Sequence, residues 1–409
     1  MKVFENFGLS HTLLETIKKL GFDKPTEIQE QSIPYIMEGK DVIGESATGS
    51  GKTLAFGCGI VDKVFPKKGL QALILTPTRE LAEQVKDSLK QLAKNKNLNI
   101  ISIYGGVSIG NQIDMLPKSE VVIATPGRLL DHLQRKTINL SQVKLVVLDE
   151  ADRMFDMGFI EDVEKIIRAC PSKRQTLFFS ATISPRIINL SRKYMVHPVK
   201  VFAKNMVDPT KLKQVYYQVL KNLKLSLLTH LLNNEKSGLV MVFCNTRINT
   251  DFVAKNLKAN DIDAIPIHGG LSQNKRTYTM GLFNKEKVGV LVCTDVASRG
   301  LHVENVSHIY NYEIPKDPND YVHRIGRTAR AGHEGKVVNL LSDNDYGSFS
   351  NILSEYRMFK IERMKNIDFK RISPVKQGRE RGRNERSSSN FSENRSRFGQ
   401  KKRFSHKRR

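Results

Sequence analysis

The stretch with the clearest chemistry is Ser46-Ala47-Thr48-Gly49-Ser50-Gly51-Lys52-Thr53. It follows a short apolar run at residues 41–43 and leads into another at residues 54–56, which predicts a strand, a glycine-rich turn and a helix. Glycines let backbone N–H groups close around a phosphate, and the start of the helix adds further donors. Lys52 would reach the β- and γ-phosphates, and the Thr53 hydroxyl would hold Mg²⁺. The stretch is therefore a candidate nucleotide-phosphate loop, with Ser46 where the general pattern has glycine.

A second candidate group is the set of carboxylates in Asp149-Glu150-Ala151-Asp152, which directly follows the apolar run at residues 145–148. Parallel α/β sheets bind ligands at the carboxyl ends of their strands. We expect Asp149 to hold Mg²⁺ through water and Glu150 to polarise the attacking water. The phosphate loop upstream favours this interpretation over an ordinary charged loop that begins a helix.

Two side chains that precede the phosphate loop in sequence, Phe22 and Gln29, could recognise a base. The amide of Gln29 has the geometry to hydrogen-bond adenine at N6 and N7 together, and Phe22 offers a face on which the ring can stack. A phenylalanine and a glutamine near a proline are common in proteins, so the signal depends on their position just before the loop.

The elements that must position these groups follow a repeating pattern. Residues 1–40 are predicted to be helical, with Gly21 as a stop, and apolar runs of strand length then alternate with helical patterns. Continuous apolar runs indicate buried parallel strands, which predicts an α/β fold of two parallel sheets flanked by helices. We find no convincing sequence repeat between the two halves. The predicted strands lie at 72–75, 100–103, 121–123, 145–148 and 176–179, then at 239–243, 264–267, 288–292, 308–311 and 336–340.

The pattern divides the chain into four parts. Residues 1–203 form an N-terminal ATP-binding domain, 204–212 a linker, 213–368 a second domain of similar size, and 369–409 a basic tail rich in Arg and Ser. The tail lacks the apolar residues for a core, so we expect it to be disordered.

Composition limits the class of partner. The net charge is +24, and residues 371–409 alone hold fourteen Lys or Arg against three Glu, which predicts a polyanionic partner such as nucleic acid. No apolar run reaches the ~18 residues of a membrane span. Widely spaced Cys58, Cys170, Cys244 and Cys293 are expected to be reduced and buried, which fits a cytoplasmic protein.

The sequence resembles the DEAD-box ATP-dependent RNA helicases of superfamily 2. The likeness rests on Asp149-Glu150-Ala151-Asp152, on the segment from Phe22 to Gln29 and on the phosphate loop, whose family form explains Ser46. It extends from Phe4, which matches an isolated upstream aromatic near the nucleotide, to about Leu341. The resemblance implies two tandem RecA-like domains that close on ATP and on one RNA strand.

The resemblance also implies roles for residues that composition and spacing alone do not assign. Ser180 and Thr182, with Asp152 and His323, are expected to couple hydrolysis to unwinding, and Arg299 and Gly300 to contact the nucleotide. The expected RNA contacts are Pro77, Thr78, Arg79, Gly105, Gly106, Thr125, Pro126, Gly127, Arg128, Asn245, Gln273, Arg276 and Thr294.

The second domain is expected to supply arginines to a nucleotide that it does not itself bind. The spacing in His323-Arg324-Ile325-Gly326-Arg327-Thr328-Ala329-Arg330 suits an arginine finger, with Arg327 and Arg330 at the γ-phosphate. Two positions depart from the family pattern. His302 replaces an aspartate linked to the ribose, and Ala329 replaces a glycine, which matters only if the backbone there has positive φ.

These features predict an RNA-stimulated ATPase that uses ATP and Mg²⁺ to unwind or remodel RNA locally without reading its sequence. We expect a cytoplasmic monomer that does not bind membranes; protein partners and the physiological RNA stay open, as does a nuclear location if the source is eukaryotic. Two alternatives remain: a DNA-directed motor of the same superfamily, and an ATP-gated RNA clamp with little turnover.

Overall fold

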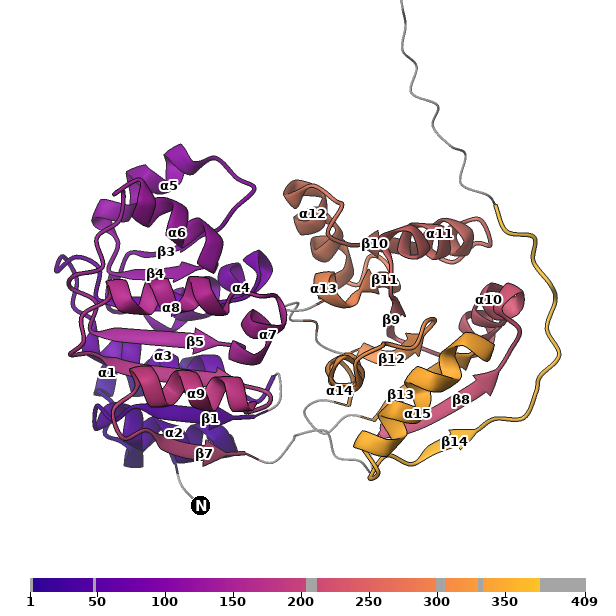
Figure 1. Ribbon diagram of the computed structural model, residues 1–409, viewed down its shortest axis with the longest axis horizontal. Helices are drawn as coiled ribbons and strands as arrows, with labels where there is room; N and C mark the ends of the chain where they lie inside the picture. The colour runs from indigo at the N-terminus through magenta and orange to yellow at the C-terminus, as the bar shows by residue number, and fades with distance from the viewer. Residues whose placement is uncertain are drawn as a thin grey trace, which may run out of the picture. The chain divides into compact units, whose positions relative to one another are not determined.

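The computed structural model describes residues 3–46, 49–203, 212–298, 303, 306–329 and 334–375. These residues form two seven-stranded sheets, one in each half of the chain, with helices on both faces of each sheet (Figure 1). The two-sheet α/β fold predicted from the apolar runs is confirmed. No helix in these ranges is long and apolar enough to cross a membrane.

The first sheet is entirely parallel, with strand order β3-β4-β2-β5-β6-β1-β7. Because β1 and β5 lie on either side of β6, the phosphate loop after β1 and the carboxylates after β5 emerge at the same edge. The first half of the chain contains η1 (Phe4–Phe7), α1 (His11–Lys19), α2 (Glu27–Met37), β1 (Val42–Glu45), α3 (Lys52–Lys63), β2 (Ala72–Leu75), α4 (Arg79–Leu92), β3 (Ile100–Ile103), α5 (Ile109–Met115), η2 (Leu116–Lys118), β4 (Val121–Ala124), α6 (Pro126–Gln134), β5 (Leu145–Asp149), α7 (Ala151–Asp156), α8 (Ile160–Ala169), β6 (Gln175–Ser180), α9 (Pro185–Tyr194) and β7 (Val199–Phe202).

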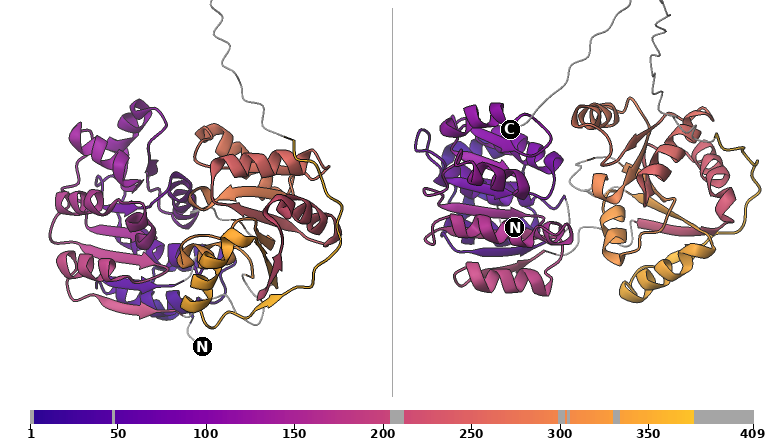
Figure 2. Two further views of the ribbon diagram at one scale, coloured as in Figure 1. Left: turned by 45° about the vertical axis from the view of Figure 1, so that its right-hand side comes forward. Right: turned by 45° about the horizontal axis from the view of Figure 1, so that its top comes forward.

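Alternate side chains of each strand fill two separate cores. Ile74 and Val147 pack with α2, α3 and α4 on one face, whereas Leu75 and Val146 pack with α6, α8 and α9 on the other. Figure 2 shows these helices on opposite sides of the sheet. Burial on both faces explains why the strands read as continuous apolar runs.

The second sheet repeats the layout, with strand order β10-β11-β9-β12-β13-β8-β14 and parallel pairing throughout. Strand by strand this is the order of the first sheet, although the sequences show no convincing repeat. The second half contains β8 (Leu212–Gln218), η3 (Lys221–Leu223), α10 (Lys224–Asn234), β9 (Leu239–Cys244), α11 (Arg247–Lys258), β10 (Ala264–Ile267), α12 (Gln273–Asn284), β11 (Val290–Thr294), α13 (Asp295–Ser298), β12 (Val306–Asn311), α14 (Pro318–Ile325), β13 (Gly335–Leu341), η4 (Asp343–Asp345), α15 (Tyr346–Glu355) and β14 (Ile361–Arg363).

The second domain is bounded by an extended segment that follows β14. Met364, Ile367, Phe369 and Ile372 pack against the core formed by α10, α11 and the sheet. The segment ends with Val375, whose N–H donates to Asn256 Oδ1 at 2.7 Å and whose carbonyl accepts from Asn256 Nδ2 at 3.3 Å. Ordered packing therefore continues past residue 368, where we placed the domain boundary.

Three strands escaped the sequence analysis: β7, β8 and β14. Each has polar residues among its apolar ones, because each lies at or next to a sheet edge where one face is partly exposed; β14, for example, is Ile361-Glu362-Arg363. The predicted linker falls outside the described residues apart from Leu212, which begins β8, and the predicted disordered tail falls almost wholly outside them. All four cysteines are buried, as expected.

Candidate nucleotide and RNA site

The phosphate loop connects β1 to α3, the strand-turn-helix arrangement that its sequence predicts. Gly51 precedes the helix with φ +93°, and a Cβ there would lie 2.2 Å from Gln29 Nε2, so both the backbone and its neighbour require glycine. Lys52 begins α3, is almost fully buried and donates from Nζ to the Ser46 carbonyl at 2.9 Å. Ala47 and Thr48 lie outside the described residues.

Gln29 ties the segment at the start of α2 to the phosphate loop. Its Oε1 accepts from the Thr26 N–H at 2.9 Å, and its Nε2 donates to the Gly51 carbonyl at 3.0 Å. Thr26 Oγ1 adds a bond to the Ser50 carbonyl at 2.7 Å. An amide has two donors and two acceptor lone pairs, so one of each remains for a base. Phe22, 45% exposed, is available for stacking.

Asp149 ends β5 in the pocket that these residues line. Phe22, Gln29, Gly51, Lys52 and Thr53 also line this pocket. Burial raises the pKa of the Asp149 carboxyl to about 7, although the nearby Lys52 ammonium opposes the shift. Its Oδ1 is buried without a hydrogen-bond partner among the described residues. Such an atom is stabilised by a cation or a bound water.

This geometry fits Mg²⁺ held by few protein ligands. Across the described residues no three His, Cys, Asp or Glu side chains gather as a metal site. Mg²⁺ in nucleotide sites keeps several waters and takes one or two protein oxygens together with the phosphates. The unpartnered Asp149 oxygen and the Thr53 hydroxyl on the first turn of α3 match that donor set.

Glu150 occupies a strained backbone position between β5 and α7. Its φ and ψ are +53° and +51°, in the left-handed region that costs roughly 1–2 kcal/mol for residues other than glycine. Its Oε2 lies 3.4 Å from Arg153 Nε, and both side chains are buried. Strain of this kind clusters at functional sites.

Asp152 connects the carboxylate group to the end of β6. Its Oδ2 accepts from the N–H groups of Ala181 and Thr182 at 3.1 and 3.0 Å, and from the Thr182 hydroxyl at 3.2 Å. Its own N–H donates to Ser180 Oγ at 3.1 Å. A shift of either segment would therefore be transmitted to the other.

A second group of predicted residues lies at the ends of β2, β3 and β4. Thr78 caps α4 by accepting from the Leu81 N–H at 3.3 Å, and Arg79 is the first residue of that helix. The Arg79 guanidinium lies against Gly106, because a Cβ there would be 2.1 Å from Nη1; Gly106 also has φ +82°. Pro77 lies between β2 and α4, and Gly105 just before Gly106.

Thr125, Pro126 and Gly127 form the cap and first turn of α6, from which Arg128 extends. Arg128 donates to the Val107 carbonyl from Nη1 and Nη2 at 3.3 and 3.2 Å. Arg79 and Arg128 thus both contact the segment around the Gly105–Gly106 turn.

The second domain repeats this arrangement with residues that the sequence analysis did not assign. Arg247 follows the capping residue Thr246 at the start of α11, and it lies near the Gly269–Gly270 turn after β10. A Cβ at Gly269 would be 3.6 Å from Arg247 Nη2. Arg247 could have been found from the sequence, because both halves of the chain contain a Thr-Arg pair after one predicted strand and a Gly-Gly pair after the next.

Other predicted residues lie at the same strand ends or on the helices that follow them. Asn245 follows β9, Thr294 ends β11, and Gln273 and Arg276 lie on α12. Arg324, which the sequence analysis left without a role, is 1% exposed and holds these ends together. It bonds Asp295 through two N–H groups at 2.6 and 2.7 Å and Asn245 Oδ1 at 2.9 Å.

The predicted arginine-finger segment follows α14. His323 belongs to that helix, and Arg327 lies just beyond it with 2% exposure. Ala329 has φ +53°, so the methyl group that replaces the usual glycine sits on a strained backbone. Arg299, Gly300, His302 and Arg330 lie outside the described residues.

Phe4, which we expected to contact the nucleotide, lies in the hydrophobic core instead. It is 4% exposed, packs edge-on against Phe7 at 5.9 Å between ring centroids, and belongs to the core on the α2–α4 face. In η1 both rings point inward, which ties the N-terminal segment to the domain. Phe4 is thus not brought into the pocket with Phe22.

Comparison with known proteins agrees with this geometry. Residues 26–190 match the family "DEAD/DEAH box helicase", and residues 223–332 match "Helicase conserved C-terminal domain". A protein of Limosilactobacillus reuteri named ATP-dependent RNA helicase CshA is 43% identical over 364 residues, which are 88% of this chain and 73% of that protein. The DEAD-box ATP-dependent RNA helicase CshA of Bacillus subtilis is 42% identical over 366 residues, 88% and 74% of the two chains.

Solved structures extend the likeness to the fold. A DEAD box protein of Methanococcus jannaschii is 41% identical, with TM-score 0.54 over 89% of this chain and 99% of that one. Saccharomyces cerevisiae Dbp5 bound to RNA and ADP BeF3 is 28% identical, with TM-score 0.80 over 89% and 96%. The two sheets are therefore tandem RecA-like domains, and the chain belongs to the DEAD-box family of ATP-dependent RNA helicases.

Proposed function

We propose that this chain is an ATP-dependent RNA helicase in which RNA-stimulated ATP hydrolysis drives local unwinding of RNA or removal of bound protein. The observation that carries this proposal is the buried, unpartnered Asp149 oxygen in the pocket lined by Lys52, Phe22 and Gln29. It matches what a nucleotide with its metal would require, and family membership supports the rest.

ATP binds to the first domain. Adenine stacks on Phe22 and bonds the free donor and acceptor of Gln29, while the loop from Ser46 to Thr53 and Lys52 hold the phosphates. Lys52 now bonds a backbone carbonyl, so it exchanges that bond for a charge-assisted one when phosphate arrives.

Thr53 and, through water, Asp149 would hold Mg²⁺, which supplies neutralisation of phosphate charge. Glu150 accepts a hydrogen bond from the attacking water and orients it in line with the γ-phosphate. Arg153, 3.4 Å away, holds the Glu150 carboxylate in place. Arg327 and Arg330 of the second domain stabilise charge in the transition state, and Arg299 and Gly300 complete the nucleotide contacts.

RNA lies across strand ends of both domains. In the first, Arg79 and Arg128 bind phosphates, while Gly105 and Gly106 let the strand approach the backbone closely. In the second, Asn245, Gln273, Arg276 and Thr294 contribute, and we add Arg247. Contacts to phosphate and 2′-hydroxyl groups read no sequence but separate RNA from DNA.

The two ligands act on one another through closure of the domains. Only the closed state brings Arg327 to the γ-phosphate, so RNA promotes hydrolysis and ATP promotes RNA binding by the same factor. Within the first domain, Asp152 carries movement of the carboxylate group to Ser180 and Thr182. His323 serves the same coupling from the second domain.

We further propose that the protein acts as a monomer in the cytoplasm and that the basic tail tethers RNA near the core. The bacterial source of the relatives and the four buried, unpaired thiols support the location. Fourteen Lys or Arg among residues 371–409 support the tether.

The proposal is tested by steady-state ATPase measurements without nucleic acid, with single-stranded RNA and with DNA of the same sequence. Stimulation by RNA alone supports the helicase, and loss of turnover in Lys52→Ala supports the site. Equal stimulation by DNA would instead identify the DNA-directed motor, and binding of both ligands without multiple turnover would identify the clamp.

A further inference from the structure

A chain of buried side chains lies behind Arg128. Gln112 on α5, 3% exposed, donates from Nε2 to the Tyr104 carbonyl at 3.1 Å and accepts from Arg128 Nη1 at Oε1 at 3.1 Å. Because a guanidinium can only donate, the Arg128 contact fixes which end of the amide is the oxygen.

His132, on α6 one turn after Arg128, completes the chain. It is fully buried, with Nε2 3.0 Å from Gln112 Oε1 and Nδ1 2.8 Å from Thr137 Oγ1. Since Gln112 Oε1 is an acceptor, Nε2 must carry a proton. Burial, assisted by the positive charge of Arg128, lowers the pKa of His132 and so favours the neutral ring. The Thr137 hydroxyl lies within bonding distance of both Nδ1 and the His132 carbonyl, at 2.8 and 3.2 Å, which fixes the other side of the ring.

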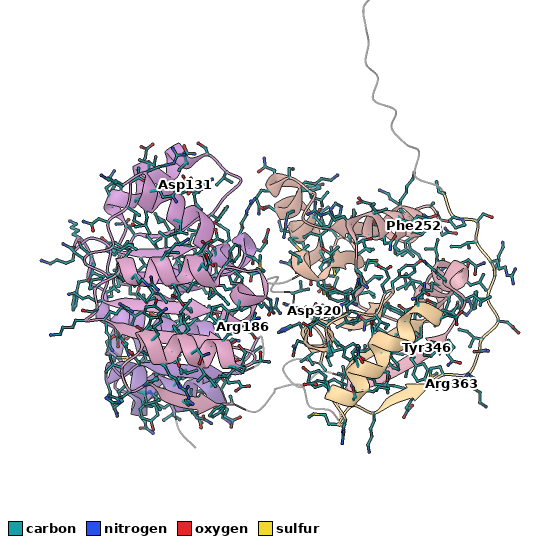
Figure 3. The ribbon with its side chains drawn as sticks, viewed as in Figure 1. Asp131, Arg186, Phe252, Asp320, Tyr346 and Arg363 are labelled. Atoms are coloured by element: carbon teal, nitrogen blue, oxygen red, sulfur yellow. The ribbon has the colours of Figure 1, made fainter. Side chains whose placement is uncertain are left out.

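These hydrogen-bonded side chains fix both ends of the Gly105–Gly106 turn. Gln112 bonds the carbonyl of Tyr104 just before the turn, and Arg128 bonds the carbonyl of Val107 just after it. Asp131, labelled in Figure 3, lies 3.7 Å from Arg128 Nε on the exposed side of α6. Three groups therefore hold the guanidinium: the Gln112 amide, the Val107 carbonyl and the Asp131 carboxylate.

We propose that Gln112 and His132 are positioning residues for RNA binding: they hold Arg128 and the Gly105–Gly106 turn in the conformation that receives an RNA phosphate. This inference rests on the proposed function, because it assumes that Arg128 and the turn contact RNA. Neither residue has to touch RNA itself.

The expected change in the KM for RNA follows from the hydrogen bond that a substitution at His132 removes. Loss of the single neutral hydrogen bond between His132 and Gln112 predicts a rise of roughly fivefold in the KM for RNA. The maximal turnover at saturating RNA and the KM for ATP should not change, because neither residue lines the nucleotide pocket.

The test measures RNA-stimulated ATPase of the full chain carrying His132→Leu, which removes both ring nitrogens at similar volume. His132→Gln offers an amide donor to Gln112 and should restore part of the RNA affinity. His308→Leu is the matched control, because His308 is a mostly buried ring whose contacts, Ser307 and Glu235, lie in the other domain. Melting temperatures establish that each variant is folded, and Gln112→Met replaces His132→Leu if the latter is not.

A double-mutant cycle that combines His132→Leu with Arg128→Ala distinguishes a positioning role of His132 from a general packing role. If His132 acts through Arg128, adding His132→Leu to Arg128→Ala produces no further rise in the KM for RNA. Additive effects, or an unchanged KM in a folded His132→Leu, would overturn the positioning role. If Arg128→Ala itself leaves the KM unchanged, the assigned RNA contact fails instead, so the two failures are distinguishable.

Discussion

The two halves of the chain share one strand order but divide the chemistry unequally. At the ends of β2 and β9 each domain places Thr-Arg at the start of a helix, and after β3 and β10 each places Gly-Gly against that arginine. The phosphate loop after β1 has no counterpart after β8, where Val219-Leu220-Lys221 follows. The strand-end arrangement that we assign to RNA is thus duplicated, whereas only the first domain carries a phosphate loop.

The glutamates that follow β5 and β12, the corresponding strands of the two sheets, have different surroundings. Glu150 follows Asp149, whose buried Oδ1 has no hydrogen-bond partner among the described residues. Glu313, two residues beyond β12, instead accepts bonds from the Asn245 N–H and from Asn249 Nδ2, both at 2.7 Å. A carboxylate whose hydrogen bonds are satisfied stabilises its loop, whereas a buried oxygen without a partner is typical of a site that binds a cation or water. On the proposed mechanism, the same fold therefore carries one catalytic glutamate, Glu150, and one structural glutamate, Glu313.

The largest expected effect contrasts these two glutamates. Glu150→Gln should lower RNA-stimulated kcat by about 10²–10⁴, because an amide cannot accept the water proton. Glu313→Gln should change kcat little, because Glu313 does not line the nucleotide pocket and the amide oxygen still accepts one of its two bonds. Steady-state turnover at saturating RNA and ATP measures both, and equal losses would remove the distinction between the domains.

A smaller effect tests the duplicated surface. Arg79→Ala and Arg247→Ala should each raise the KM for RNA about tenfold, the loss of one charge-assisted hydrogen bond, without altering the KM for ATP. Exposed Arg357→Ala serves as the control. If only Arg79 matters, the second domain's Thr-Arg and Gly-Gly pair has some other purpose.

The strained position in the second domain predicts a gain in stability. Ala329→Gly should relieve a left-handed backbone at φ +53° and stabilise the domain by about 1 kcal/mol, or a rise of roughly 2–4 °C in its melting temperature. Ala297→Gly, in helix α13, should destabilise instead. A drop in melting temperature for Ala329→Gly would contradict the assigned conformation.

The smallest effect is a pH dependence that both domains share. Burial lowers the pKa of His132 in the first domain and of His308 in the second. The unfolded state, with a pKa near 6.5, then binds more protons below that pH, so each histidine makes folding less favourable as the pH falls through 6.5. We expect melting temperature to decrease by roughly 2 °C per domain between pH 7.5 and 5.5. His132→Asn and His308→Asn should each flatten the curve, and an unchanged slope would exclude these groups as its source.

The sequence predicted the buried strands well, and the phosphate-loop residues lie on the strand-turn-helix that it predicts. Strands covered on both faces, such as Ala72–Leu75, contain only apolar residues, and phosphate chemistry demands fixed types at fixed spacing. Edge strands such as Ile361–Arg363 lack that pattern. The Gln112–His132 chain was out of reach because it joins residues twenty positions apart through contacts that no local spacing encodes.

Arg324 and Phe4 also show what a sequence motif alone does not reveal. Arg324 lies three residues before Arg327 in the predicted arginine-finger segment, yet it bonds Asp295, Asn245 and Asn311 inside its own domain. Phe4 matches an aromatic expected near the nucleotide yet packs in the core. A motif specifies residue types, whereas burial and partners decide which of them remain available to a ligand.

On the proposed mechanism the first domain provides most of the ATP-binding contacts, whereas hydrolysis also needs Arg327 of the second domain. The most direct measurement compares ATP affinity and RNA-stimulated turnover in Arg327→Ala, with a fluorescent ATP analogue for binding. We predict affinity within about threefold of the unmodified protein and a loss of turnover of about 10³ or more. Unchanged turnover, or loss of ATP binding with turnover falling only in proportion, would contradict the division of labour between the two domains.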